Sequence, residues 1–117
     1  MTSVRARNMM EVLAPAALAA AVLALSATVA FGQDAAALAT EGKRVFGEQG
    51  CYGCHTIGKT GTPIATDLTR VGSKYPESYL RGWLREPQQQ KPGAHMPKIQ
   101  MSESDARAVA AYLASLK

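Results

Sequence analysis

The sequence has only two cysteines, few large aromatic residues and no run of five or more charges of one sign. Two cysteines exclude a multi-bridge disulfide scaffold, and the lack of charge runs excludes a nucleic-acid-binding tail or a charged disordered segment. One Trp, two Phe and four Tyr offer little material for a core. Because chains this short usually recruit a metal, a disulfide or a partner, we expect something other than side chains to fill part of the interior.

Residues 1–32 differ from the rest of the chain. Arg5 and Arg7 precede a stretch without charge from Val12 to Gly32, which predicts a signal peptide or an N-terminal membrane anchor. The stretch is long for a signal peptide and just long enough to span a bilayer, whereas its end at Ala30-Phe31-Gly32 is compatible with cleavage. Under both interpretations the positive-inside rule places residues 33–117 beyond the membrane. We expect a periplasmic domain that is either soluble or anchored to the inner membrane.

Residues 33–117 form a single predicted domain with eleven basic and eight acidic residues, a formal charge of +3. Apolar residues at helical spacing predict three helices, namely 34–46 capped by Asp34, 76–86 ended by Pro87, and a last helix capped by Ser102. Glycines and prolines predict loops over 51–67 and 88–100. No alternating apolar run supports a sheet, so we expect an all-α domain.

The pentapeptide Cys51-Tyr52-Gly53-Cys54-His55 is the most informative motif. C-x-x-C-H is the attachment signature of c-type haem. Residues three and four apart share a face of a helical turn, so two thioethers and the His55 imidazole can reach one porphyrin. A thioredoxin-like pair would need a βαβ context, and a structural zinc site would need more ligands than the chain offers. A Cys51–Cys54 disulfide is chemically possible.

The loop beyond residue 90 contains three candidates for a second iron ligand besides His55, namely Met96, Met101 and His95. Met101 directly precedes the predicted helix cap, where an inward apolar side chain is usual. His95 is a lone loop histidine, which is usually solvated. Met96 lies between Pro92 and Pro97, which stiffen the backbone that would hold a weak thioether ligand. The residues therefore favour Met96.

From Asp34 to Lys117 the chain resembles the class I c-type cytochromes. The resemblance is carried by the pentapeptide after a helix bearing Gly42 and Phe46, by Tyr79–Pro87 followed by Met96-Pro97, and by a closing helix ending Ala110-Ala111-Tyr112-Leu113. It implies three or more helices wrapped around one haem c, bound covalently through Cys51 and Cys54, with His55 and Met96 on opposite sides of the iron. It also implies that Gly42 allows a close helix crossing with Phe46 and Tyr112 at the contact, and that Trp83 lies on the methionine side of the haem.

One part of the chain departs from the family pattern. The usual Gly-Pro pair below the haem is missing, and the matching stretch is Ile64-Ala65-Thr66-Asp67-Leu68 with the proline earlier, at Pro63. Because a ligating imidazole almost always has a second-shell acceptor, we expect a carbonyl between Pro63 and Thr66 to orient His55.

Histidine and methionine ligation together would leave no open iron position for oxygen or substrate. We therefore expect a one-electron carrier, not an enzyme, that docks on a protein donor and a protein acceptor and binds no nucleic acid. Two alternatives remain: a haem subunit permanently bound to a membrane oxidoreductase, and a gas-binding or peroxidatic haem protein if Met96 does not bind. The expected docking rim comprises Gly53, Lys91, His95 and Lys98, and the expected haem-propionate partners are Lys74, Tyr75 and Arg81.

Overall fold

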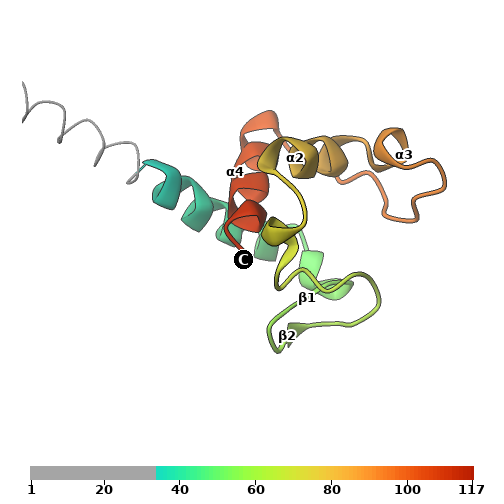
Figure 1. The fold of residues 1–117 in the computed structure, drawn as a ribbon, viewed down its shortest axis with the longest axis horizontal. Coiled ribbons are helices and arrows are strands. Elements are labelled where there is room, and N and C mark those ends of the chain that lie inside the picture. The colour runs from blue at the N-terminus through green and yellow to red at the C-terminus, as the bar shows by residue number, and fades with distance from the viewer. Residues whose placement is uncertain (1–33) are drawn as a thin grey trace, which may run out of the picture. The chain divides into compact units, whose positions relative to one another are not determined.

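The computed structural model describes residues 34–117, and its compact unit spans Ala35–Lys117. The predicted signal or anchor segment over 1–32 lies outside the described residues. A helix over residues 34–48 comes first, and the other elements follow in this order (Figure 1): η1 Cys51–Gly53, β1 Thr56–Ile57, β2 Thr60–Gly61, η2 Val71–Ser73, α2 Glu77–Arg85, α3 Pro87–Gln90 and α4 Glu103–Ala114. Within residues 34–117, no helix has the length and apolar character needed to cross a membrane.

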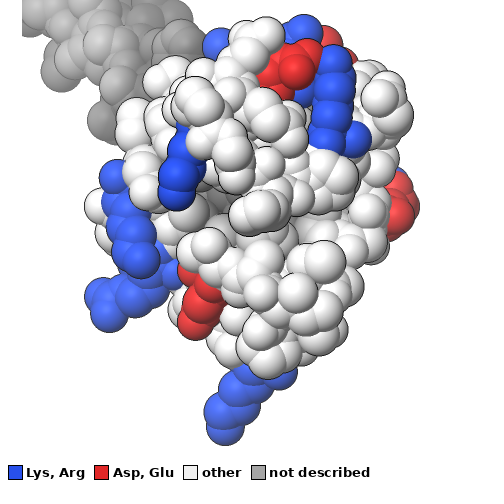
Figure 2. All heavy atoms as spheres, turned by 90° about the vertical axis from the view of Figure 1, so that its right-hand side faces the viewer, with Lys and Arg blue, Asp and Glu red and all other residues white. Residues whose placement is uncertain are grey.

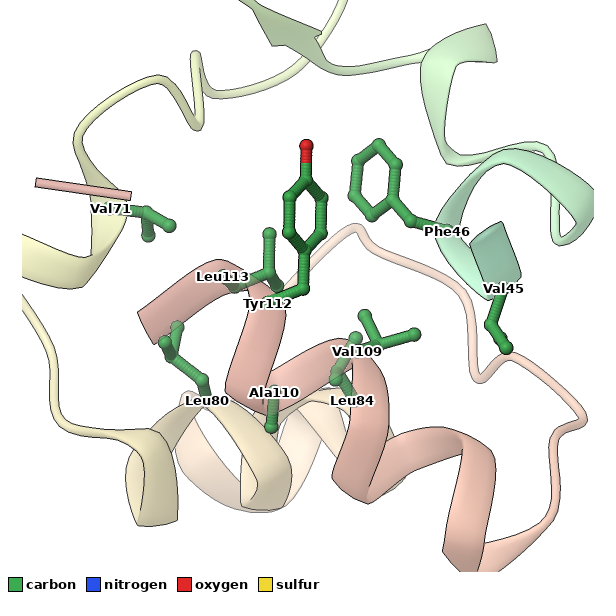
Figure 3. Close-up of a cluster of buried hydrophobic side chains, with 9 residues drawn as sticks. All are labelled: Val45, Phe46, Val71, Leu80, Leu84, Val109, Ala110, Tyr112 and Leu113. Carbon is green, nitrogen blue, oxygen red and sulfur yellow. The ribbon is translucent and has the colours of Figure 1, made fainter. Parts of the chain in front are cut away.

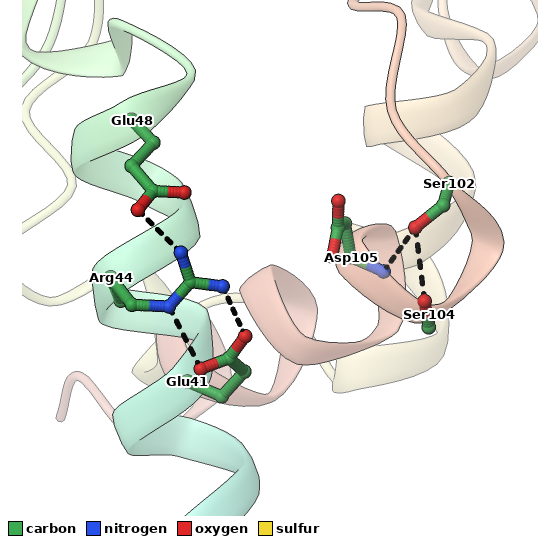
Figure 4. A network of polar contacts seen from close by, with 6 residues as sticks. All are labelled: Glu41, Arg44, Glu48, Ser102, Ser104 and Asp105. Carbon is green, nitrogen blue, oxygen red and sulfur yellow. Dashed lines mark hydrogen bonds and ion pairs between the residues drawn. The ribbon is translucent and has the colours of Figure 1, made fainter.

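The helix over residues 34–48 buries the face that its apolar spacing predicted. Gly42, Val45 and Phe46 are buried, and Leu38 is half-buried. The expectation that Asp34 caps this helix is corrected, because Asp34 is itself helical. On the exposed side, Arg44 lies between Glu41 and Glu48 and forms ion pairs with both (Figure 4).

This helix crosses α4 at Gly42. A Cβ atom at Gly42 would lie 1.9 Å from the carbonyl oxygen of Ala108 and 2.8 Å from Cβ of Tyr112, so only glycine allows the two backbones to approach this closely. Next to the crossing, the rings of Phe46 and Tyr112 meet edge to face with centroids 5.9 Å apart (Figure 3). The close crossing implied by the family resemblance is confirmed.

Helix α4 is the central element of the core. Ser102 caps it as predicted, because its hydroxyl oxygen accepts a hydrogen bond from the Asp105 backbone N–H at 3.1 Å (Figure 4). Ala108 and Tyr112 of α4 are buried where the helix over 34–48 crosses. Together the elements bury one apolar cluster (Figure 3): Val45, Phe46, Val71, Leu80, Leu84, Val109, Ala110, Tyr112 and Leu113.

Two local predictions are corrected. The second helix ends before Pro87 as predicted, since α2 stops at Arg85, but Pro87 begins α3 where a loop was expected, because proline suits the first turn of a helix and its side chain is buried here. The predicted absence of strands is wrong for one short antiparallel pair, in which Thr56 lies opposite Gly61 and Ile57 opposite Thr60. Strands of two residues are too short to produce an alternating pattern. The domain otherwise has the expected helical, cytochrome c-like fold.

Candidate functional site

The pentapeptide forms a single tight turn. The 3-10 helix η1 covers Cys51–Gly53, and the Cys51 carbonyl oxygen accepts hydrogen bonds from the backbone N–H groups of Cys54 at 3.2 Å and His55 at 3.0 Å. Cys51 is half-buried and Cys54 is exposed. Burial raises the pKa of the Cys51 thiol, which keeps this group neutral at neutral pH. The predicted helical turn therefore brings Cys51, Cys54 and His55 together.

The imidazole of His55 is oriented by a backbone carbonyl. Its Nδ1 atom lies 2.7 Å from the carbonyl oxygen of Thr66. A carbonyl can only accept a hydrogen bond, so Nδ1 carries the proton and Nε2 keeps its lone pair for a metal. A carbonyl between Pro63 and Thr66 was expected to orient His55, and in the structure this carbonyl is that of Thr66.

The loop that supplies this carbonyl is hydrogen-bonded to the pentapeptide at two points. The Ala65 N–H donates to the Cys54 carbonyl oxygen at 2.7 Å, and the Thr62 N–H donates to that of Tyr52 at 2.9 Å. Farther along, the Thr69 hydroxyl oxygen accepts a hydrogen bond from the Gly58 N–H at 2.8 Å. These contacts hold the Thr66 carbonyl in place without the missing Gly-Pro pair.

Asp67 and Thr69 support this loop and were not singled out from the sequence. The Asp67 carboxylate accepts hydrogen bonds from the backbone N–H and the hydroxyl of Thr69, and these bonds lower the pKa of Asp67 below its usual value. The signal that could have found them is the Asp-x-Thr spacing, since aspartate commonly bonds to the backbone N–H two residues on.

Met96 and Trp83 form the second half of the site. The indole Nε1–H of Trp83 donates a hydrogen bond to the Met96 sulfur at 3.0 Å, and both side chains are half-buried. Trp83 also ends a row of stacked rings, with Tyr79 next at a centroid distance of 6.4 Å and Tyr75 a further 4.6 Å away. The other ligand candidates lie elsewhere in the same loop: His95 is exposed, and Met101 is half-buried just before the cap of α4.

The residues present fit a covalently bound haem. The segments 51–70 and 88–105, which carry the thiols, His55 and Met96, contain no fully buried side chain. The half-exposed apolar side chains of both segments nevertheless pack against the same core cluster: Cys51, Tyr52, Ile57, Leu68 and Met96. A c-type haem site needs two thiols for attachment to the porphyrin, with an imidazole nitrogen and a thioether sulfur as iron ligands, and a flat apolar ring suits the surface that these side chains offer.

The charges around the site differ from expectation at one residue. Lys98, expected on a basic rim, forms an ion pair with Glu86, which compensates its charge, whereas Lys91 and His95 are exposed. Figure 2 looks onto the side where α3 lies in Figure 1, and it shows an uncharged centre with Lys, Arg and acidic side chains around the edge. This face resembles a docking surface with a polar rim more than a continuous basic patch.

The sequence was compared with known proteins. The family described as Cytochrome c matches residues 39–117. A cytochrome c oxidase subunit 2 from Alkalihalophilus pseudofirmus is 43% identical over 89 residues, which cover 68% of this chain and 26% of the relative. The chain thus spans about a quarter of the length of that relative. No solved structure matches this chain. The chain belongs to the cytochrome c family and bears one haem c, covalently attached through Cys51 and Cys54.

Proposed function

We propose that this domain transfers single electrons between respiratory redox proteins, with His55 and Met96 as the two axial ligands of the iron. Bound haem c supplies the one-electron redox centre. The observation that carries the proposal is the orientation of both ligand atoms by hydrogen bonds: the His55 ring is held by the Thr66 carbonyl, and the Met96 sulfur is held by the Trp83 indole. Held by His55 and Met96, the iron would have no position open for oxygen or an organic substrate.

Each ligand keeps one free donor orbital in this arrangement. His55 uses Nδ1 for the Thr66 carbonyl and retains Nε2. The Met96 sulfur accepts one hydrogen bond and retains a second lone pair. Because a methionine ligand raises the reduction potential relative to a second nitrogen ligand, the domain suits a carrier that delivers electrons to a strong acceptor.

Replacement of Met96 tests the ligand assignment. The ferric holoprotein of Met96→Ala should lose the weak long-wavelength absorbance band of a methionine-ligated haem, bind cyanide readily and have a lower reduction potential. The matched control is Met101→Ala, a methionine of the same loop, which should keep the wild-type spectrum and potential. An unchanged spectrum in Met96→Ala would refute the assignment.

The acceptor that we propose is a membrane oxidase. Support comes from the similarity to a cytochrome c oxidase subunit 2, which also favours a second candidate, a haem subunit permanently bound to such a complex. The two candidates predict different behaviour when membranes are solubilised in mild detergent at moderate salt. A permanent subunit should co-purify with oxidase subunits in constant ratio, whereas a shuttling carrier should separate from them.

We further propose a periplasmic location, supported by Arg5 and Arg7 in front of the uncharged stretch from Val12 to Gly32. An intact-mass measurement on protein purified from its native host reports the haem and the leader together. A mass that corresponds to residues from about 33 onward plus haem indicates cleavage, and the full chain plus haem indicates a retained anchor. Recovery of the holoprotein in the cytoplasmic fraction would contradict the proposed location.

A further inference from the structure

The loop that carries Met96 folds back toward the α2–α3 region through a tight turn. The Lys91 N–H closes the end of α3 by donating to the Pro87 carbonyl oxygen at 3.0 Å, and the Ala94 N–H then donates to that of Lys91 at 3.0 Å. Between them, Pro92 precedes Gly93, whose φ is 82°. Proline followed by a glycine with positive φ is the pattern of a type II turn. The chain therefore reverses direction immediately before Met96.

The Gln88 side chain contacts the backbone of the segment that follows this turn, from Ala94 to Met96. The amide nitrogen of Gln88, in α3, lies 3.3 Å from the carbonyl oxygen of Ala94 and 3.4 Å from that of Met96. A glutamine amide nitrogen carries two N–H donors, and carbonyl oxygens only accept, so one side chain can bond both carbonyls at once. Gln88 thus contacts the backbone on both sides of His95 and at the proposed ligand itself.

The neighbouring glutamines do not share this contact. Gln88, Gln89 and Gln90 are consecutive, and all three are exposed. The amide of Gln90 lies against Gly82 in α2, where a Cβ atom would come within 2.5 Å of its nitrogen. Among residues 34–117, the Gln89 side chain has no hydrogen-bond partner. Gln89 is therefore a natural control of the same type, exposure and helix.

We propose that Gln88 is a positioning residue for the methionine ligand, and that it sets how readily Met96 gives way to an external ligand of the iron. This inference rests on the proposed function, because it requires Met96 to bind the iron. The thioether is a weak ligand, so its occupancy depends on how rigidly the loop holds it. Trp83 acts on the sulfur atom, whereas Gln88 acts on the backbone, and displacement of Met96 from the iron would strain or break the Gln88 hydrogen bonds.

Competition with imidazole measures this role in the ferric holoprotein, with loss of the long-wavelength band as the readout. Gln88→Ala should bind imidazole about fivefold to thirtyfold more tightly than wild type, since each of the two neutral hydrogen bonds contributes roughly 1 kcal/mol. Gln88→Glu, which has the same shape but no donor, should show at least the same increase, because its carboxylate would face two carbonyl oxygens. Gln89→Ala should match wild type in both imidazole affinity and thermal unfolding.

The outcomes separate this inference from the proposed function. Wild-type imidazole affinity in both Gln88 variants, with the band present, would overturn the role of Gln88 alone. An equal gain in Gln89→Ala would also overturn it, because the effect would then come from the helix in general. A wild-type protein without the band, together with an unchanged spectrum in Met96→Ala, would overturn both proposals.

Discussion

The Trp83 side chain donates a hydrogen bond to the sulfur of Met96, the proposed iron ligand. This contact should therefore affect the reduction potential directly. Donation by the indole N–H draws electron density from sulfur and makes it a weaker donor to ferric iron. Trp83→Phe should therefore lower the reduction potential, by at most about 40 mV, the one-electron equivalent of a hydrogen bond of roughly 1 kcal/mol. Potentiometric titration checks this shift. Tyr79→Phe, in the same ring stack, should leave the potential close to wild type, and a rise in Trp83→Phe would contradict the argument.

Tyr112 links stability to alkaline pH. Burial, together with the neighbouring Tyr52 hydroxyl, raises the pKa of Tyr112 to about 12 from 10.0. The native state thus favours the neutral phenol, and this stabilisation is complete below pH 10, declines above it and is lost as pH passes 12. Urea unfolding between about pH 8 and 11.5 should show a steeper fall in wild type than in Tyr112→Phe. Tyr75→Phe, which changes an exposed ring, should keep the wild-type slope, and equal slopes in wild type and Tyr112→Phe would contradict the prediction.

Among the elements, the crossing of the helix over 34–48 with α4 depends on one missing Cβ atom. Gly42→Ala would place that atom 1.9 Å from the Ala108 carbonyl oxygen, so the helices must separate, at a cost of about 2–3 kcal/mol in the free energy of unfolding. Gly47 lies in the same helix, and a Cβ atom there would meet nothing within 4 Å. Gly47→Ala should instead stabilise the protein by about 0.5–1 kcal/mol. Denaturant unfolding of the two variants tests the pair, and equal effects would contradict the role of the crossing.

Considered as a whole, the domain has a small protein core. Nine buried residues form the main cluster, which lies in the helices and η2, while residues 51–70 and 88–105 bury no side chain fully. A domain of this size buries too little surface to be robust alone. The double variant Cys51→Ala/Cys54→Ala, which cannot attach haem covalently, should therefore show reduced helical circular dichroism and a broad, weakly cooperative thermal transition. A cooperative transition at the wild-type temperature would show that the side-chain core is sufficient.

Local signals allowed much of this architecture to be predicted. The cap at Ser102 and the buried positions of α4 follow from residue type and spacing within one helix. The turn that groups the two cysteines with His55 follows from five consecutive residues. Short strands and the start of α3 at Pro87 escaped prediction, because proline can either end one helix or begin another and only the burial of its ring decides between them.

The amino-acid sequence by itself determined the cofactor chemistry of the domain. Two thiols and an imidazole within five residues specify haem attachment wherever the chain folds, since their spacing is local. The acceptor at Thr66, the indole of Trp83 on the Met96 sulfur, the compensation of Lys98 by Glu86 and the reach of Gln88 across Ala94 and Met96 all depended on the fold. Each joins residues six or more positions apart, and such contacts are decided by packing and backbone direction, which no short pattern of residues encodes.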